Sequence, residues 1–327
     1  MRSPLLFLSL ALVACPSEEP EPEGCVPSNA TAAAECVDAV VFEADLTLLA
    51  VERSTGGAGW QAAQDHCRTV LTDLGFEVED HEYGTGTNVV GTKAGSGTSR
   101  GAVVVSAHYD SVDGCVGADD NASGVAGALG VARALASGSW HHDLVVACWD
   151  EEERGLVGSR AWADRAAAAG DRIEVAVSLE MIAYSDDAEG SQTFPTGFDA
   201  VFPDAVEAVE ANGSRGDFIG LVADEAADPF SAAFESFAPA SLPTVRIDVA
   251  TALLNSPAMG DLRRSDHASF WAHGIPAVMV TDTANFRYGG YHCTDFADEL
   301  SRLDLGFAAD VVRATASAAA DRLADAG

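Results

Sequence analysis

The sequence has few basic residues: 18 Lys and Arg stand against 51 Asp and Glu, which gives a formal net charge of −33. This excess of negative charge repels nucleic acids, which bind proteins largely by releasing counterions to basic side chains. Nucleic acid is therefore not an expected partner. The same charge is typical of a well-solvated protein surface, and for a cationic substrate it would add only to the rate of encounter.

Long apolar runs and internal repeats are also lacking. Residues 5–13 form an apolar segment that is too short to span a bilayer as a permanent helix, and after Arg2 it is typical of an export signal. The residues LVAC at 12–15 resemble the bacterial lipobox, in which the signal is cut before a cysteine that carries lipid. We therefore expect a signal peptide at residues 1–14 and an exported protein anchored to the lipid bilayer through Cys15. Its expected place is the bacterial cell envelope, on the outer membrane or facing the periplasm, or outside the cell. An ordinary signal peptide with a chance cysteine is the alternative.

The run PSEEPEPEG after Cys15 cannot bury apolar area, so residues 15–38 are predicted to form an extended tether. Six further cysteines lie in an exported, oxidising setting that favours pairing, but their connectivity is not readable from the sequence. The spacing C-x-x-C is absent, which argues against a structural zinc site made of thiolates. No linker marks a second domain after the tether, so residues 39–327 are expected to form one catalytic domain.

Helical and strand-like segments alternate along this domain. Strands are predicted at 76–80, 88–92, 102–107, 143–149, 174–179, 244–249 and 276–281, and helices over a segment ending at Gly75 and at 122–136, 156–168, 200–210 and 304–323. Most of the longer strands are continuous apolar runs, which is typical of strands covered on both faces. The alternation predicts an α/β fold, a three-layer α/β/α sandwich around a mixed, mainly parallel central sheet.

Acidic and histidine side chains directly follow four of the predicted strands: His108 and Asp110, the run 150–153, Glu180 and Asp282. In open α/β sheets the ligand crevice lies beyond the carboxyl ends of the strands, so we expect these side chains to converge. Clustered carboxylates in a crevice of low dielectric either take up protons or recruit a cation. Carboxylates mixed with imidazole, without thiolates, suit Zn²⁺, with Mn²⁺ or Co²⁺ as possible substitutes.

Two short spacings add detail to this prediction. Asp110, two residues after His108, is placed to accept a proton from the imidazole and to hold it in its ligating tautomer. Successive side chains on an extended segment point in opposite directions, so Glu152 and Glu153 cannot easily bind one ion. One of the two would ligate while the other works as a base. A solvated acidic turn is the alternative for this run.

Five motifs together resemble the bacterial dizinc aminopeptidases, zinc exopeptidases related to glutaminyl cyclases and glutamate carboxypeptidases. They are AHYDS (107–111), GADDNASG (117–124), EERGLVGS (152–159), SDHASFW (265–271) and YHCTD (291–295), in the family's order. The resemblance covers roughly residues 40–325 and implies a zinc-exopeptidase fold.

The resemblance also implies a site with two Zn²⁺ ions. His108 and Glu180 would bind one ion, Glu153 and His292 the other, and Asp120 would bridge them. The family's bridging aspartate directly precedes the asparagine, which selects Asp120 over Asp119.

Other residues of the motifs carry supporting roles in this resemblance. Glu152 would be the general base, and Tyr291 would donate a hydrogen bond to the developing oxyanion unless it is only a packed core residue. Asp266 and His267 would support the ligands. Glu180 departs from the aspartate of many relatives, and its extra methylene would shift that metal or alter its affinity.

The expected activity is hydrolysis of the N-terminal residue from peptides with a free N-terminus, and no obligate protein partner is evident. A glutaminyl cyclase-like enzyme with one working zinc is the alternative. A carboxypeptidase is disfavoured because no basic cluster is evident to hold a C-terminal carboxylate. A non-catalytic binding protein on the same scaffold is a further alternative. The side-chain preference is not readable, because loops between about residues 185 and 264 build the pocket.

Overall fold

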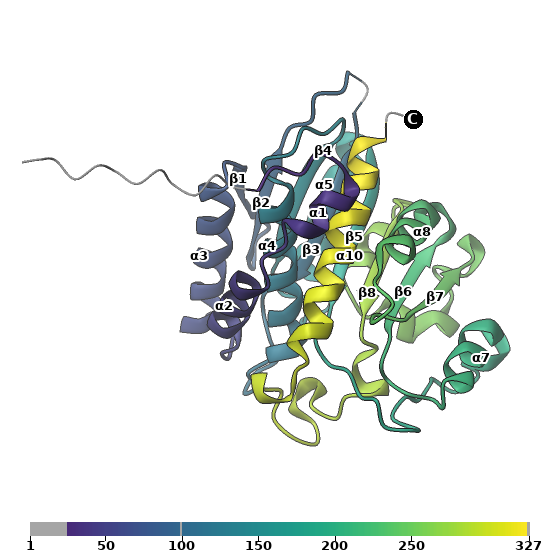
Figure 1. Ribbon diagram of the computed structural model, residues 1–327. Helices are drawn as coiled ribbons and strands as arrows, with labels where there is room; N and C mark the ends of the chain where they lie inside the picture. The colour runs from purple at the N-terminus through teal and green to yellow at the C-terminus, as the bar shows by residue number, and fades with distance from the viewer. Residues whose placement is uncertain (1–24, 99, 326–327) are drawn as a thin grey trace, which may run out of the picture.

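The structure is a computed structural model that describes residues 25–98 and 100–325. One eight-stranded sheet forms its centre, and helices cover both faces, which confirms the predicted α/β/α sandwich (Figure 1). The predicted signal peptide and the lipobox with Cys15 lie outside the described residues. Within the described ranges, no helix has both the length and the hydrophobicity needed to cross a membrane.

The sheet is mixed, with the order β1-β2-β4-β3-β5-β8-β6-β7. Its strands are β1 (Glu77–Glu82), β2 (Thr87–Lys93), β3 (Ala102–His108), β4 (Asp143–Trp149), β5 (Ile173–Glu180), β6 (Ile219–Asp224), β7 (Thr244–Val249) and β8 (Ala277–Thr281). The four neighbours β4, β3, β5 and β8 run parallel, as do β6 and β7, whereas β1–β2, β2–β4 and β8–β6 are antiparallel pairs. Sequence reasoning missed β6, the apolar run IGLVAD, and so missed the antiparallel step beside β8.

The helices are α1 (Ala30–Glu35), α2 (Ala39–Leu49), α3 (Ala58–Asp73), α4 (Gly124–Leu135), α5 (Val157–Ala169), α6 (Phe198–Val201), α7 (Pro203–Ala211), α8 (Asp228–Phe237), α9 (His267–Trp271) and α10 (Leu305–Ala324). Asp304 caps α10, because its carboxylate accepts the backbone N–H of Phe307 at 2.9 Å. The helix predicted at 200–210 is divided at Phe202, since Pro203 lacks an N–H and takes the first position of α7.

Alternate side chains of the central strands enter two separate apolar cores. Val103 and Val105 of β3 belong to the core that α2, α3, α4 and α10 cover, whereas Val104 belongs to the core on the other face, with Trp162 of α5 and Phe270 of α9. The strands are thus buried on both faces, as their continuous apolar runs predict. A sheet held in this way gives a rigid base for side chains placed at its strand ends.

The predicted boundary between tether and domain at residue 39 is wrong. Helix α1 lies inside the predicted tether, yet Ala33 is fully buried and α1 packs against α10, which it crosses in Figure 1. A disulfide between Cys25 and Cys36 brackets the helix. The alanines of ATAAAE can bury apolar surface that the Pro-Glu run before them cannot, so the folded part already includes residue 25.

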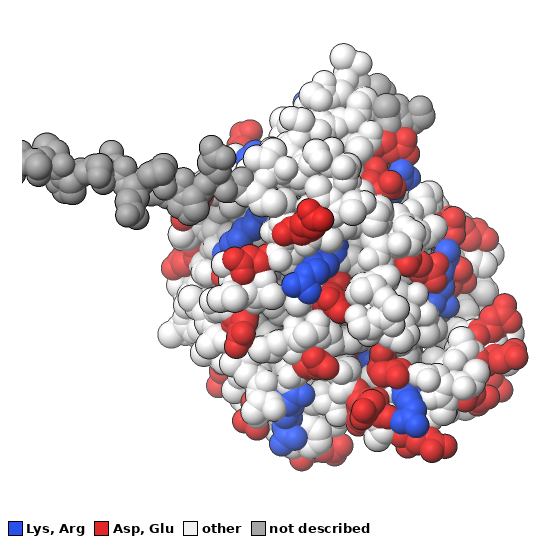
Figure 2. Space-filling model, viewed as in Figure 1, with Lys and Arg blue, Asp and Glu red and all other residues white. Residues whose placement is uncertain are grey.

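All six cysteines of the described residues form disulfides. Besides the N-terminal pair, Cys67 of α3 is bonded to Cys148 of β4, and Cys115 is bonded to Cys293 across 178 residues of sequence. Acidic side chains are dispersed over the face seen in Figure 2, and several lie beside Arg or Lys. This distribution agrees with the interpretation of the negative charge as a solvated surface.

Candidate metal centre

Three adjacent parallel strands bring the first group of predicted residues together. His108 ends β3, Glu180 ends β5, and Glu152 follows β4, whose neighbour in the sheet is β3. The Nε2 atom of His108 lies 3.4 Å from Oε2 of Glu180. One ligand atom from each of the three residues lies within 4.8 Å of the other two, which is close enough to hold one metal ion. We call these three residues the first cluster.

A second cluster consists of Asp120, Glu153 and His292, whose ligand atoms also lie within 4.8 Å of one another. Asp120 belongs to the π-helical turn η1 (Ala118–Ser123), and His292 to the 3₁₀ turn η6 (Tyr291–Cys293). Nε2 of His292 lies 3.2 Å from Oε2 of Glu153.

Asp120 joins the two clusters. Its Oδ1 atom lies 3.4 Å from Nε2 of His108, and its Oδ2 atom lies 3.4 Å from Nε2 of His292. The carboxylate therefore presents one oxygen to each cluster, which is the arrangement that a bridging ligand requires. Gly117, with φ of +61°, allows the chain to turn here, since a Cβ at that position would lie 2.1 Å from the carbonyl oxygen of Asp120.

The adjacent glutamates diverge, as their alternation on an extended segment predicts. Glu152 joins the first cluster and Glu153 the second. The carboxylate of Asp110 accepts the backbone N–H of Glu152 at 3.1 Å and that of Glu153 at 3.2 Å. Asp110 therefore fixes the backbone of both glutamates, a role that sequence reasoning missed.

Asp110 also lies behind His108, although the contact differs in detail from the prediction. Nδ1 of His108 donates to the backbone carbonyl oxygen of Asp110 at 3.2 Å, and the carboxylate Oδ1 is 3.4 Å away. A proton held on Nδ1 leaves Nε2 free to act as a ligand. The ligating tautomer of His108 stays a prediction, and the closer of its two contacts at Nδ1 is to the backbone carbonyl rather than to the predicted carboxylate.

Glu180 is oriented by two polar neighbours despite its longer side chain. Its Oε2 atom accepts a hydrogen bond from Oγ of Ser265 at 2.8 Å and from Nδ2 of Asn121 at 3.3 Å. Asn121 also donates to the carbonyl of Leu179, so one amide ties the turn η1 to the end of β5. The extra methylene therefore does not remove Glu180 from the cluster.

The donor set fits divalent metal ions. Three buried atoms of the two clusters lack a hydrogen-bond partner in the described residues, namely His108 Nε2, Asp120 Oδ2 and Glu153 Oε1, and all three are imidazole or carboxylate atoms of the kind that bind zinc. Burial, together with the charge of Asp120, raises the pKa of Glu153 to about 7. Burial likewise raises the pKa of Glu152 well above its usual range. A cation would relieve this crowding of carboxylates.

Two residues that hold the turn η1 were missed by sequence reasoning. The buried guanidinium of Arg53 donates to the carbonyl oxygens of Gly117 at 2.9 Å and of Asp120 at 3.4 Å. The carboxylate of Asp298 accepts the backbone N–H groups of Asp119 at 3.0 Å and Asp120 at 2.9 Å. No local motif marks Arg53 or Asp298, because each acts on backbone atoms far away in the sequence.

Other predicted residues lie beside the clusters without joining them. Asp282 follows β8 as predicted, but its carboxylate accepts the backbone N–H groups of Tyr184 at 3.1 Å and Ala284 at 2.9 Å and is not a ligand. Asp266 is buried near the first cluster, and burial raises its pKa to about 7. Nε2 of His267 donates to the carbonyl of Leu262 at 2.9 Å, so this ring holds the backbone and not the ligands.

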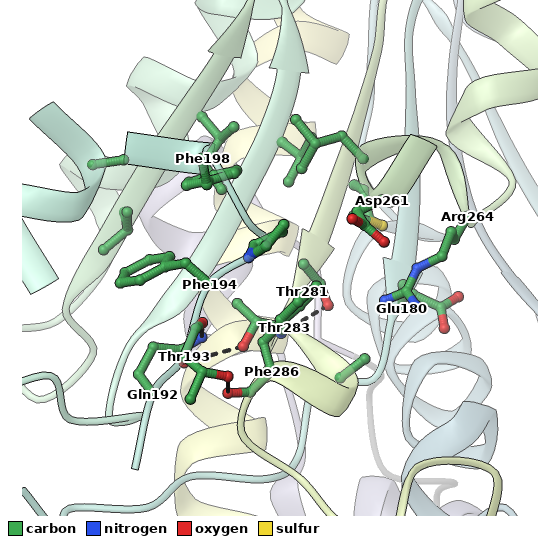
Figure 3. Close-up of a pocket in the computed structure, with 18 of the residues that line it drawn as sticks. Glu180, Gln192, Thr193, Phe194, Phe198, Asp261, Arg264, Thr281, Thr283 and Phe286 are labelled. Atoms are coloured by element: carbon green, nitrogen blue, oxygen red, sulfur yellow. Dashed lines mark hydrogen bonds between the residues drawn. The ribbon is translucent and has the colours of Figure 1, made fainter. Parts of the chain in front are cut away.

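An apolar pocket opens beside the clusters, with Glu180 among its lining residues (Figure 3). Tyr291 also lines this pocket. It has a volume of about 720 Å³, including open solvent at the mouth. Its apolar lining comes from β6, β7, β8 and the segments around them: Phe194, Phe198, Phe218, Val222, Val245, Ile247, Leu262, Met279 and Phe286. Arg264 and Asp261 also line the pocket and are labelled in Figure 3.

Tyr291 lies between this pocket and the second cluster. Its ring stacks on His292 with 3.8 Å between the ring centres. Burial, reinforced by the charge of Asp120, raises the pKa of the hydroxyl above its usual range. The hydroxyl therefore stays protonated near neutral pH and is able to donate a hydrogen bond.

Comparisons of the sequence and of the fold with known proteins identify the family of this chain. The uncharacterized protein YfbL of Escherichia coli (strain K12) is 33% identical over 216 residues, so the match covers 61% of this chain and 61% of that relative. The LapA aminopeptidase of Legionella pneumophila has the same fold, with a TM-score of 0.68 and 16% identity over 90% of this chain and 75% of its own. The glutaminyl cyclase of Porphyromonas gingivalis matches with a TM-score of 0.60 and 16% identity over 86% of this chain and 98% of its own. The model of peptidase family M28 matches residues 88–319, more than half of the sequence, and the chain therefore belongs to that family.

Proposed function

We propose that the protein is a zinc-dependent aminopeptidase that removes N-terminal residues from peptides. The observation that carries this proposal is the position of Asp120, whose two oxygens lie 3.4 Å from His108 and 3.4 Å from His292. His108 and Glu180 would hold one ion, and Glu153 and His292 the other. The imidazole and carboxylate donors suit zinc, with manganese or cobalt as substitutes.

When bound, two zinc ions would polarise the peptide carbonyl and lower the pKa of a water molecule toward about 7. The task left to the chain is proton transfer and positioning. The carboxylate of Glu152 would take the proton of the attacking water and later give it to the leaving nitrogen. Its raised pKa suits this role, because burial makes it a stronger base than an exposed glutamate.

Tyr291 and Asp110 would assist Glu152 in different ways. The protonated hydroxyl of Tyr291 would donate a hydrogen bond to the carbonyl oxygen as negative charge develops there. Asp110 holds the backbone N–H of Glu152 at 3.1 Å and so keeps the base in place. Neither residue needs to exchange a proton during the reaction.

The apolar pocket indicates the class of substrate. Its aliphatic and aromatic lining would accept a large apolar side chain of the N-terminal residue, while the free α-amino group would lie near the carboxylates of the clusters. Because Glu180 lines the pocket and also belongs to the first cluster, an N-terminal side chain in the pocket places its own carbonyl near the clusters.

The proposal is tested with a panel of aminoacyl chromogenic amides, assayed with added zinc and with a chelator. Leu and Phe amides should be cleaved faster than Ala, Asp or Lys amides, the chelator should abolish the activity, and N-acetylated substrates should not react. A peptide that begins with glutamine belongs in the same panel. Release of ammonia from it by a protein with one zinc per chain would favour a glutaminyl cyclase instead.

We further propose that the protein is exported and anchored to the cell envelope through a lipid on Cys15. This proposal is supported by the lipobox-like residues LVAC at 12–15 and by the Pro-Glu run that follows. The full chain expressed in a bacterium should partition into detergent, and a Cys15→Ala variant should not.

A further inference from the structure

The two metal clusters have unequal structural support. His108 and Glu180 end neighbouring strands in the middle of the sheet, and the side chain of His108 is only 1% exposed. Asp120 and His292 of the second cluster belong to short turns, and the side chain of His292 is 35% exposed. The second cluster therefore needs something other than the sheet to hold its ligands in place.

The backbone of His292 lies in a region that non-glycine residues seldom adopt. His292 has φ of +53° and the next residue, Cys293, has φ of +55°. Such conformations persist when the surrounding structure holds them. The imidazole of His292 stacks on Tyr291 with 3.8 Å between the ring centres, but within the described residues no hydrogen bond is found at its Nδ1, whereas Nδ1 of His108 donates to the carbonyl of Asp110.

A disulfide connects this turn to the other side of the second cluster. Cys293 is bonded to Cys115, which is buried in the segment between His108 and Asp120. Arg53 fixes that segment through the carbonyl oxygens of Val116 at 3.0 Å and Gly117 at 2.9 Å. The disulfide thus ties the turn of His292 to the anchored segment that leads into Asp120.

Asp298 strengthens the same connection. Its backbone N–H donates to Sγ of Cys293 at 3.4 Å, while its carboxylate accepts the N–H of Asp120 at 2.9 Å. The disulfide, Asp298 and the turn η1 therefore form one continuous set of contacts around the second cluster. The link to Glu180, which ends β5, is less direct, because it passes through Asn121 of η1, whose Nδ2 donates to Oε2 of Glu180 at 3.3 Å.

We propose that the Cys115–Cys293 disulfide is the positioning element of the second metal site. While it is closed, it holds His292 beside Asp120 and Glu153. When it is open, the second site loses its metal and the first site keeps its own. This inference rests on the proposed two-zinc function and adds to it a dependence of the second site on the redox state of the protein.

The test measures zinc per chain after equilibration of the full protein with a zinc buffer and removal of free metal. The variant is Cys115→Ala/Cys293→Ala, and the matched control is Cys25→Ala/Cys36→Ala, which removes the disulfide that brackets α1. The wild type and the control should hold two zinc ions per chain, and the variant one. The dissociation constant of the weaker site should rise about 10- to 100-fold, as for loss of an outer-shell support of a metal ligand.

A second measurement covers the case in which the variant does not fold. The intact wild type is treated with a water-soluble phosphine, which becomes a phosphine oxide with an oxygen from water and converts the disulfide into two thiols. Cys293 is partly exposed, whereas Cys67 and Cys148 are fully buried, so the phosphine should reduce Cys115–Cys293 before Cys67–Cys148. Alkylation of the free thiols and mass spectrometry then identify the protein in which Cys67–Cys148 is still bonded. One of the two zinc ions should be released.

The outcomes separate this inference from the proposed function. A wild-type protein that binds fewer than two zinc ions contradicts the two-zinc function itself. If the wild type binds two and the folded variant also binds two with unchanged affinity, the inference is overturned. Loss of both ions from a folded variant also overturns it, because the disulfide would then support the whole site and not the second cluster alone.

Discussion

The carboxylate of Asp110 accepts the backbone N–H of Glu152 at 3.1 Å, and its other oxygen accepts the N–H of Glu153 at 3.2 Å. One buried side chain thus sets the direction of both glutamates, which serve different clusters. Since Asp110 also follows His108 on the same extended segment, it couples the end of β3 to the end of β4. The site depends on this residue although it is assigned to no metal.

Substitution Asp110→Asn should lower kcat while leaving the fold intact. The asparagine keeps one oxygen acceptor but turns an NH₂ group toward one of the two backbone N–H groups. Loss of an outer-shell contact of this kind typically costs about 10- to 100-fold in activity or metal affinity. Steady-state kinetics and zinc content are compared with Asp113→Asn, an exposed aspartate of the same loop, which should behave as the wild type. Equal activity of both variants would contradict a positioning role for Asp110.

Substitution Glu152→Gln should separate proton transfer from metal binding. Glutamine has nearly the same shape but cannot take a proton, so turnover should fall by about 10² or more because general-base catalysis contributes that much. The zinc content should remain near that of the wild type. Glu151→Gln is the control, because Glu151 lies beside Glu152 but pairs with Thr85 and Arg154. Turnover that survives in Glu152→Gln would remove Glu152 from the role of base.

The affinity of the second cluster for metal should increase as the pH rises. Burial raises the pKa of Glu153 to about 7 in the metal-free protein, so below pH 7 this carboxyl group holds a proton that a metal ion must displace. Affinity of the second cluster should therefore increase from pH 6 to pH 8 and fall as the pH drops below 7. Competition with a chromogenic chelator at the two pH values measures the change. An affinity that is independent of pH would show that Glu153 holds no proton in this range when the metal is absent, and so would contradict its raised pKa.

Much of this site was predictable because its residues follow strands that the sequence marks clearly. The apolar runs before His108 and Glu180 are long enough to identify β3 and β5, and parallel strands place their carboxyl ends at one edge. Alternation on an extended segment then separates Glu152 from Glu153. These predictions need only the local pattern of apolar residues and the rule that parallel strands place their carboxyl ends at one edge of the sheet.

The remaining parts of the site depend on contacts between distant segments, which local pattern does not encode. Arg53 and Asp298 form hydrogen bonds with backbone atoms of the turn η1. Such bonds require no particular motif, so the sequence does not distinguish these two residues from other Arg and Asp residues. The disulfide between Cys115 and Cys293 could not be predicted from the sequence, because only the fold shows that these two distant cysteines are neighbours. The apolar run IGLVAD is long enough to predict the strand β6. Its antiparallel pairing with β8 is not predictable in the same way, because β8 comes after β7 in the sequence but lies between β5 and β6 in the sheet.

The size of the apolar pocket should set the preference for the N-terminal residue. Val245 of β7 is one of the lining residues, and Val245→Phe would fill part of the space. Cleavage of Leu and Phe amides should fall in kcat/KM by about 10- to 200-fold, the range for one or a few methylene groups in a hydrophobic pocket, while cleavage of the Ala amide should change little. Ile247→Val, which slightly enlarges the same wall, is the matched comparison. A uniform loss on all three amides would place the N-terminal side chain elsewhere.

The buried His267 should make the protein less stable in acid, independently of metal. Burial lowers the pKa of its ring to about 4, compared with about 6.5 in the unfolded chain, so between these pH values only the unfolded chain binds the proton. Stability is unaffected above pH 6.5 and falls as the pH drops from 6.5 to 4, by about 3 kcal/mol if the full difference in pKa is realised. Urea unfolding with chelator at pH 7 and pH 4.5 measures this fall, and His267→Gln provides the reference because its amide still donates to Leu262 but does not titrate. The wild type should lose about 2 to 3 kcal/mol more than the variant between the two pH values. Parallel losses in both proteins would mean that other groups, and not the ring of His267, dominate the acid sensitivity.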